Sequence, residues 1–214
     1  IRLSLVGSEM CIRDSSGTTL FDRSGVGAPL DLTLADEDAV SRVPEGYFVH
    51  TATRIASPGP GTKVIDALQG TNEFTLEAWL RTANLRQDGP ARIITLSKEG
   101  PQLNVALVQQ RSANGVAQLA LRLKTRVAPQ NGQSYHEAIA ELPLTTDLTH
   151  VLVTRKADGT VVFYINGTEQ GRLAAPGSFE AWNDSYPLTL ANDAEANRPW
   201  LGEYHLAAIY QRAL

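Results

Sequence analysis

Apolar and polar residues alternate through residues 149–171, THVLVTRKADGTVVFYINGTEQG. Val151 and Val153 fall on one side of the chain, while His150 and Leu152 fall on the other. This two-residue period is typical of a β-strand that buries one face. The start of the segment is therefore predicted to be extended.

Two turn signals divide the same segment. Asp158 and Gly159 form an Asp-Gly pair, and Asn166 and Gly167 form an Asn-Gly pair after a second alternating stretch. Both pairs tolerate the positive φ angles that two-residue hairpin turns require. The segment therefore predicts three antiparallel strands joined by two tight turns.

Residues 73–82 give the clearest single strand. Its apolar face, which we expect in the core, carries Phe74, Leu76, Ala78 and Leu80. The opposite face carries Thr75, Glu77, Trp79 and Arg81. A large ring among polar groups is typical of a solvent-facing sheet surface on which a sugar or peptide lies. The alternative is that Trp79 lies beneath a neighbouring loop.

Short strand patterns recur along the rest of the chain between turns rich in Gly, Pro and Asn. Further strands are predicted at residues 18–21, 30–34, 47–55, 91–97, 103–110, 116–125, 136–142, 188–191 and 201–211. Residues 63–70 form the one predicted helix, which Gly70 would end. The pattern predicts an all-β fold, a two-sheet antiparallel β-sandwich of the jelly-roll type with at most one short helix.

The bulk composition fits one core and argues against some partners. A chain of 214 residues with 43% hydrophobic content can bury roughly 70% of its unfolded surface. A net charge of −4 gives no basic field for a polyanion, so we expect no nucleic-acid partner. No apolar run is long enough to span a bilayer, so we expect no membrane insertion.

The first residues, IRLSLVGSEMCIRDS at 1–15, differ from the rest. They begin without Met and lack the long apolar core of a signal peptide. The string resembles translated sequencing-adapter read-through, and the alternative is an ordinary terminus or a first strand. We expect residues 1–16 to be non-native or disordered and residues 17–214 to form a single domain. Cys11, the only cysteine, can form no intrachain disulfide and has no base placed beside it for catalysis.

Three phrases in one order resemble bacterial laminin-G-like domains of the concanavalin A-like lectin and glucanase superfamily. They are FTLEAW at 74–79, HVLVTRKADGTVVFYINGTEQG at 150–171 and RPWLGEYHLAAIYQRAL at 198–214. The phrase DRSG at 22–25, with the alternating leucines that follow it, extends the resemblance towards residue 17. The resemblance implies a concanavalin A-like sandwich.

The motifs of the superfamily's enzymes are missing from the sequence. The β-glucan-cleaving members carry Glu-x-Asp-x-x-Glu on one strand, which places two carboxylates in a cleft. Here Glu73 and Glu77, like Glu137 and Glu141, are spaced Glu-x-x-x-Glu without the Asp. No Gly-x-Ser-x-Gly motif is present, and the four histidines lack zinc-binding spacing. A polysaccharide-cleaving enzyme is therefore the least favoured function.

The resemblance also implies one structural calcium, the only cofactor we expect, with Asp22 and Glu203 as its side-chain ligands. Calcium binds six to eight oxygens in irregular geometry. Relatives commonly place further acidic residues after the second position, where this chain has His205 and Leu206. The alternatives are that Asp22 holds an Asx-turn and that Glu203 forms a surface salt bridge.

Aromatic residues next to predicted loops are the candidate ligand-binding groups, because rings can stack on sugar faces. They are Trp182, Tyr186, Trp200 and, on the strand described above, Trp79. The alternative is that these rings anchor the loops to the core.

These observations favour a non-catalytic recognition module of a larger secreted or surface protein. We expect its partner to be a carbohydrate or a cell-surface protein, and we expect other domains of the same parent chain beside it. The location would be extracellular or at the cell surface, with the signal segment outside this fragment. The alternative is a structural spacer without a ligand of its own.

Overall fold

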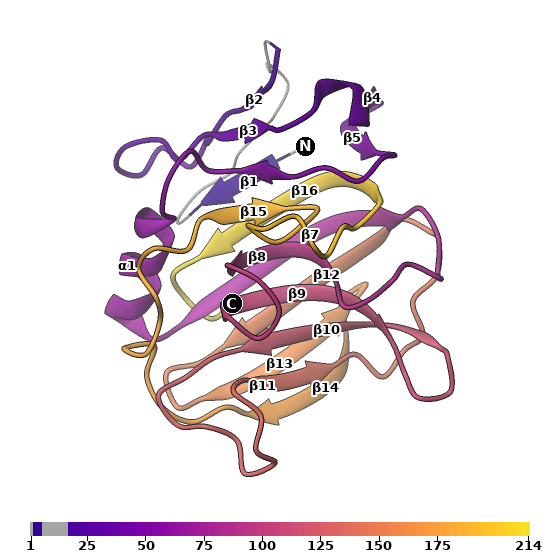
Figure 1. The fold of residues 1–214 in the computed structure, drawn as a ribbon. Helices are drawn as coiled ribbons and strands as arrows, with labels where there is room; N and C mark the ends of the chain where they lie inside the picture. The colour runs from indigo at the N-terminus through magenta and orange to yellow at the C-terminus, as the bar shows by residue number, and fades with distance from the viewer. Residues whose placement is uncertain (1, 6–16) are drawn as a thin grey trace.

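A computed structural model describes residues 2–5 and 17–214, and Cys11 lies outside these residues. In the described part of the chain the strands form two stacked eight-stranded sheets, with one α-helix at their edge (Figure 1). Pairing is antiparallel except where the first strand runs parallel to the last. The predicted all-β sandwich is confirmed. None of the described helices is long and apolar enough to cross a membrane.

The first sheet, sheet A, contains the predicted meander and the last strand. Its order is β14 (Thr168–Ala174), β13 (Thr160–Ile165), β12 (Thr149–Arg155), β7 (Phe74–Thr82), β16 (Gly202–Tyr210), β5 (Gly46–Val49) and β4 (Val40–Val43), with β1 (Arg2–Leu5) beside β16. The two predicted hairpin turns are present, with positive φ at Gly159, Asn166 and Gly167.

The second sheet, sheet B, is built from the remaining strands. Its order is β11 (His136–Ile139), β10 (Ala117–Leu123), β9 (Leu103–Arg111), β8 (Ala91–Ser97), β15 (Leu188–Leu190), β6 (Ile55–Ala56), β3 (Leu32–Leu34) and β2 (Thr19–Leu20). The predicted strand 47–55 is two strands in different sheets. The chain leaves sheet A after Val49, where the N–H groups of His50 and Thr51 both donate to the Ala39 carbonyl. Strand β4 and the 3₁₀ turn Glu37–Ala39 were not predicted.

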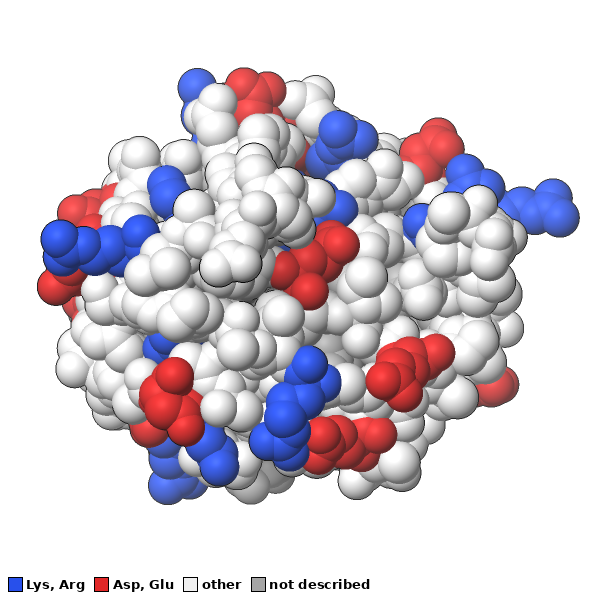
Figure 2. All heavy atoms as spheres, turned by 90° about the horizontal axis from the view of Figure 1, so that it is seen from below, with Lys and Arg blue, Asp and Glu red and all other residues white. Residues whose placement is uncertain are grey.

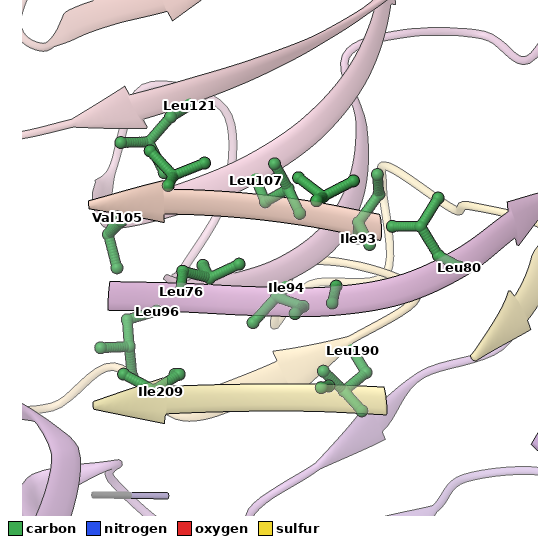
Figure 3. Close-up of a cluster of buried hydrophobic side chains, with 14 of the residues drawn as sticks. Leu76, Leu80, Ile93, Ile94, Leu96, Val105, Leu107, Leu121, Leu190 and Ile209 are labelled. Carbon is green, nitrogen blue, oxygen red and sulfur yellow. The ribbon is translucent and has the colours of Figure 1, made fainter. Parts of the chain in front are cut away.

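The core lies between the two sheets and is mostly aliphatic (Figure 3). Leu76, Leu80 and Ile209 reach it from sheet A, and residues such as Leu107 and Leu121 reach it from sheet B. Removing this apolar surface from water is the main stabilising contribution to the fold, at about 25 cal/mol per Å².

Helix α1 (Thr62–Thr71) packs Val64, Ile65 and Leu68 against the core. It runs through Gly70, so the predicted helix end is wrong. Asn72 ends the helix instead, in the left-handed conformation and with its N–H bonded to the Leu68 carbonyl. Asn can adopt this conformation at a helix end as Gly does.

The outer faces of the two sheets differ in how much of them is covered. On sheet B, Ala106, Val108 and Ala120 are fully buried and pack with Tyr135. Arg92 is also fully buried there, and its Nη2 donates to the Gly100 carbonyl. Burial, followed by repulsion from Arg122, lowers the pKa of Arg92 to about 10. The outer face of sheet A instead leaves a large aromatic side chain in solvent.

Candidate functional site

Three of the four aromatic residues predicted to bind a ligand lie in the core. Trp182 stacks on Phe179 with ring centroids 4.4 Å apart, and its Nε1 donates to the Lys124 carbonyl at 2.7 Å. Tyr186 is buried as well. Their rings present no face to a ligand, so the predicted role is corrected. These residues anchor the loop between β14 and β15 to the sandwich.

Trp200 is the most enclosed of the predicted ligand-binding residues, with none of its surface exposed. Its Nε1 donates to Gln109 Oε1 at 3.0 Å, and its ring meets Tyr204 edge to face at 4.9 Å. A Cβ at Gly202 would lie 2.4 Å from Trp200 Cη2, so this ring fits only over a glycine. Trp200 is a packing residue, and its prediction as a ligand-binding residue is wrong for that reason.

Trp79 lies on the outer face of sheet A with 39% of its surface exposed. Its indole stacks on the imidazole of His150, the directly opposite residue on β12, with ring centroids 4.8 Å apart and planes 25° apart. The alternative that Trp79 lies beneath a loop is wrong, because so much of the ring is in solvent.

Glu77 lies two positions before Trp79 on the same face, and two side chains hold its carboxylate. His150 Nε2 lies 2.9 Å from Oε1, and the Tyr210 hydroxyl donates to Oε2 at 2.9 Å. The hydrogen bond from His150 holds the pKa of Glu77 below its usual value, although burial opposes this. An ionised carboxylate has about four acceptor positions, so Glu77 can accept further hydrogen bonds.

A second carboxylate lies farther along the same face. Glu203 on β16 is opposite Arg81 on β7, with 3.6 Å between Arg81 Nη1 and Glu203 Oε1. Its Oε2 lies 2.9 Å from His205 Nε2. We name this surface the Trp79 face and define it by Glu77, Trp79, Arg81, His150, Glu203, His205 and Tyr210. It spans the adjacent strands β12, β7 and β16.

The strand positions of Glu77 and Glu203 are farther apart than the two carboxyl groups of a glycosidase pair. Glu77 lies four strand positions from Arg81, the partner of Glu203, which is about 13 Å along the sheet. Glycoside hydrolysis by two carboxylates requires them about 5–9.5 Å apart. The arrangement instead suits binding, with a ring face flanked by hydrogen-bonding groups that are already oriented.

The two predicted calcium ligands occupy different sheets. Asp22 follows β2 of sheet B, where Lys63 Nζ lies 2.5 Å from its Oδ2, and the N–H groups of Ser24 and Leu30 also bond its carboxylate. Burial alone would raise the pKa of Asp22, but the bonds from Lys63 and these N–H groups together lower it. Glu203 is held on sheet A by the partners described above.

In the described residues no three His, Cys, Asp or Glu side chains are grouped to hold a metal ion. Asp22 and Glu203 each contact a cationic side chain of their own surroundings, Lys63 and Arg81 respectively. The two residues do not fit the predicted calcium site as a pair.

Sequence reasoning placed Glu77 and Arg81 on the face of Trp79 but did not bring in the neighbouring strands. Alternation places Glu77 and Arg81 on its face, and this signal is visible in the sequence. The contributions of His150, Tyr210 and Glu203 depend on the register of β12 and β16 against β7. Register follows from long-range pairing, which one sequence does not reveal.

The comparison with protein families decides the identity. A laminin-G-like family model, described as the concanavalin A-like lectin/glucanases superfamily, matches residues 56–214. The chain belongs to this superfamily. The predicted resemblance is therefore confirmed. No curated protein matches the sequence.

Solved structures share the superfamily's fold at low identity. The binding domain of Paraclostridial Mosquitocidal Protein 1 is 16% identical, with a TM-score of 0.59 over 94% of this chain and 48% of that one. The carbohydrate-binding module CBM40 of the Ruminococcus gnavus IT-sialidase, solved with α2,3-sialyllactose, is 12% identical, with a TM-score of 0.51 over 74% and 88%.

A sialidase from Trypanosoma rangeli is 16% identical, with a TM-score of 0.55 over 94% of this chain and 30% of that one. This chain therefore spans about half of the toxin binding domain and less than a third of the sialidase. At these identities the likeness is one of fold.

Proposed function

We propose that this domain is a non-catalytic carbohydrate-recognition module and that the Trp79 face is its binding surface. The observation that carries the proposal is the partly exposed indole of Trp79. His150 stacks on this indole and also bonds the ionised carboxylate of Glu77 beside it. An exposed tryptophan held rigidly on a sheet loses little conformational entropy when a ligand covers it.

The chemistry of a sugar ring matches this surface. One side of a pyranose is rich in C–H groups and stacks on an aromatic face, and its rim carries hydroxyls that donate and accept hydrogen bonds. Glu77 and Glu203 supply acceptors, and Arg81, about half exposed, supplies donors. On the molecular face in Figure 2, acidic and basic groups are interspersed among uncharged ones, without a broad patch of one sign among the described residues. The Trp79 face also mixes both signs, with Arg81 beside Glu203, and this suits a neutral or weakly charged ligand better than a polyanion.

The comparisons support binding as the general role. The similar structures include a toxin's binding domain and a module bound to sialyllactose. We infer that the domain belongs to a larger secreted or surface protein, where it would hold neighbouring domains against a polysaccharide or a glycosylated surface. A protein partner and a spacer without any ligand are the competing outcomes of the test.

A glycan array distinguishes these outcomes. The wild-type domain should bind a small set of glycans, and Trp79→Ala should lose at least about tenfold in affinity, which is 1.4 kcal/mol. The matched control is Ile139→Ala, which removes an equally exposed side chain, 40% against 39%, from sheet B. If Trp79→Ala still bound glycans as the wild type does, the binding site would not be the Trp79 face. If the wild-type domain bound no glycan, the remaining functions would be a spacer without a ligand or a domain that binds a protein partner.

A further inference from the structure

A concave feature lies at one end of the sandwich, apart from the side chains of the Trp79 face. It is a hollow of about 220 Å³ beneath the loop 142–149 and beside the turn that joins β13 to β14. Its floor is formed by the core residues Leu119, Leu144 and Ile165. Leu142, half exposed, lies at its opening. The hollow is smaller than the roughly 300–1,000 Å³ of sites for drug-sized ligands, so it fits one sugar-sized group.

The rim of the hollow is polar and internally braced. The Thr145 hydroxyl donates to Asp147 Oδ2 at 3.1 Å, and the Thr149 hydroxyl donates to the Asp147 carbonyl at 3.0 Å. The carboxylate of Asp147 keeps unused acceptor positions, since one oxygen takes a single bond from Thr145. A wholly apolar ligand would strip water from this carboxylate without replacing its hydrogen bonds, which is unfavourable.

Asn166 connects the hollow to the Trp79 face. Its Oδ1 accepts the backbone N–H of His150 at 2.9 Å, and a backbone N–H can only donate, so the oxygen is fixed in that position. The amide NH₂ is therefore the part of Asn166 left to donate to a ligand. His150 stacks on Trp79, and its neighbour Thr149 lines the hollow. The two sites lie one residue apart along β12.

We propose that this hollow is a second subsite that takes a methyl-bearing sugar residue, such as an N-acetylated or 6-deoxy hexose. The methyl group contacts the leucine and isoleucine floor, while the ring hydroxyls bond Asp147 and Asn166 at the rim. The choice of a sugar rests on the proposed function, whereas the size, the apolar floor and the polar rim do not. Burying one methyl group favours the methyl-bearing sugar about fourfold over its plain counterpart.

The test is a titration of the whole domain, labelled at Leu, Val and Ile methyl groups, followed by NMR. The probes are four monosaccharides: N-acetyl-D-glucosamine and D-fucose, with D-glucose and D-galactose as their counterparts without a methyl group. The methyl signals of Leu142, Leu144 and Ile165 should shift with the first pair at concentrations at least about fourfold lower than with the second. Equal shifts with all four sugars, or none in the tens of millimolar, overturn the proposal.

Leu142→Asn should weaken the response of the hollow to the methyl-bearing sugars several-fold. The matched control is Val127→Asn, an equally exposed side chain, 47% against 50%, that does not line the hollow. An unchanged response in Leu142→Asn contradicts the subsite. The Trp79 indole signal reports separately on the Trp79 face. A hollow that responds while the indole and the array stay silent refutes the proposed function alone, and the reverse result refutes the second subsite alone.

Discussion

Trp200 and Trp79 are the same residue type in opposite surroundings. Trp200 is enclosed, its N–H is bonded to Gln109, and a glycine is required beneath its ring. Trp79 lies on an outer sheet face, stacks on one imidazole and keeps 39% of its surface exposed. The difference shows that Trp200 stabilises the sandwich, whereas Trp79 keeps part of its surface in contact with solvent.

The same contrast applies to two carboxylates. Asp22 is bonded by main-chain N–H groups and a lysine at a buried turn, so it organises the backbone. Glu77 is bonded by side chains on an open face, so it organises a surface. We therefore expect substitutions of the first kind to change stability and those of the second kind to change binding.

The largest expected effect is that of Trp200→Ala. It removes a fully buried ring, leaves a cavity and deletes one of the hydrogen bonds to Gln109, which should cost about 3–5 kcal/mol of unfolding free energy. Urea unfolding measures this loss. Trp200→Phe, which keeps most of the apolar ring, should lose less than the alanine variant. If Trp200→Ala lost under 1 kcal/mol, the ring would not be the packing residue described here.

Asp22→Asn should have the second largest effect. It should lower the unfolding free energy by about 1–3 kcal/mol at neutral pH, because Lys63 loses its anionic partner beside a buried turn. The folded-state pKa of Asp22 is lowered, so its stabilisation is present above the unfolded-state value of about 3.9 and disappears as the pH falls through the folded-state pKa.

Urea midpoints between pH 7 and pH 2.5 measure this dependence. The difference in urea midpoint between wild type and Asp22→Asn should become smaller in acid. The Asp66→Asn variant, changed at an exposed position, should show no such difference from wild type. A gap that is constant with pH would contradict the role of the charge.

Trp79→Ala should cost less than about 1 kcal/mol of stability, since surface substitutions usually change it little. Its only described ring contact is the stack on His150. The same unfolding assay, run beside the Trp200 variant, tests this directly. A loss as large as that of Trp200→Ala would show that Trp79 is structural and would remove the basis for the binding face.

Tyr210→Phe should have the smallest effect on stability, about 0.5 kcal/mol, because it deletes one hydrogen bond to a partly exposed carboxylate. It should also raise the pKa of Glu77, since a donor to the ionised form is lost. The stabilisation from Glu77 would then fade at a higher pH in the variant as the solution is acidified. An NMR titration of the Glu77 carboxyl carbon measures the change, and an unshifted pKa would contradict the network.

Much of the fold follows from local patterns. Alternation located β7, β8 and β12 within a residue, and the Asp-Gly and Asn-Gly pairs located both turns of the meander. The end of α1 was missed because Asn72 can take the left-handed conformation two residues beyond Gly70. The sequence left open whether Trp182 and Trp200 bind a ligand or anchor loops to the core, because their burial depends on Lys124 and Gln109, which are distant in sequence.

The position of β16 determines when the protein can acquire its structure during synthesis. This strand lies in the middle of sheet A between β7 and β5, yet it follows every other described strand in the sequence. Until it emerges from the ribosome, the two flanking strands expose unpaired backbone groups to other nascent chains. Pairing between strands that are distant in sequence slows folding. The yield of folded domain should therefore depend on how well the unpaired edges of β7 and β5 are protected until β16 (Gly202–Tyr210) has been made.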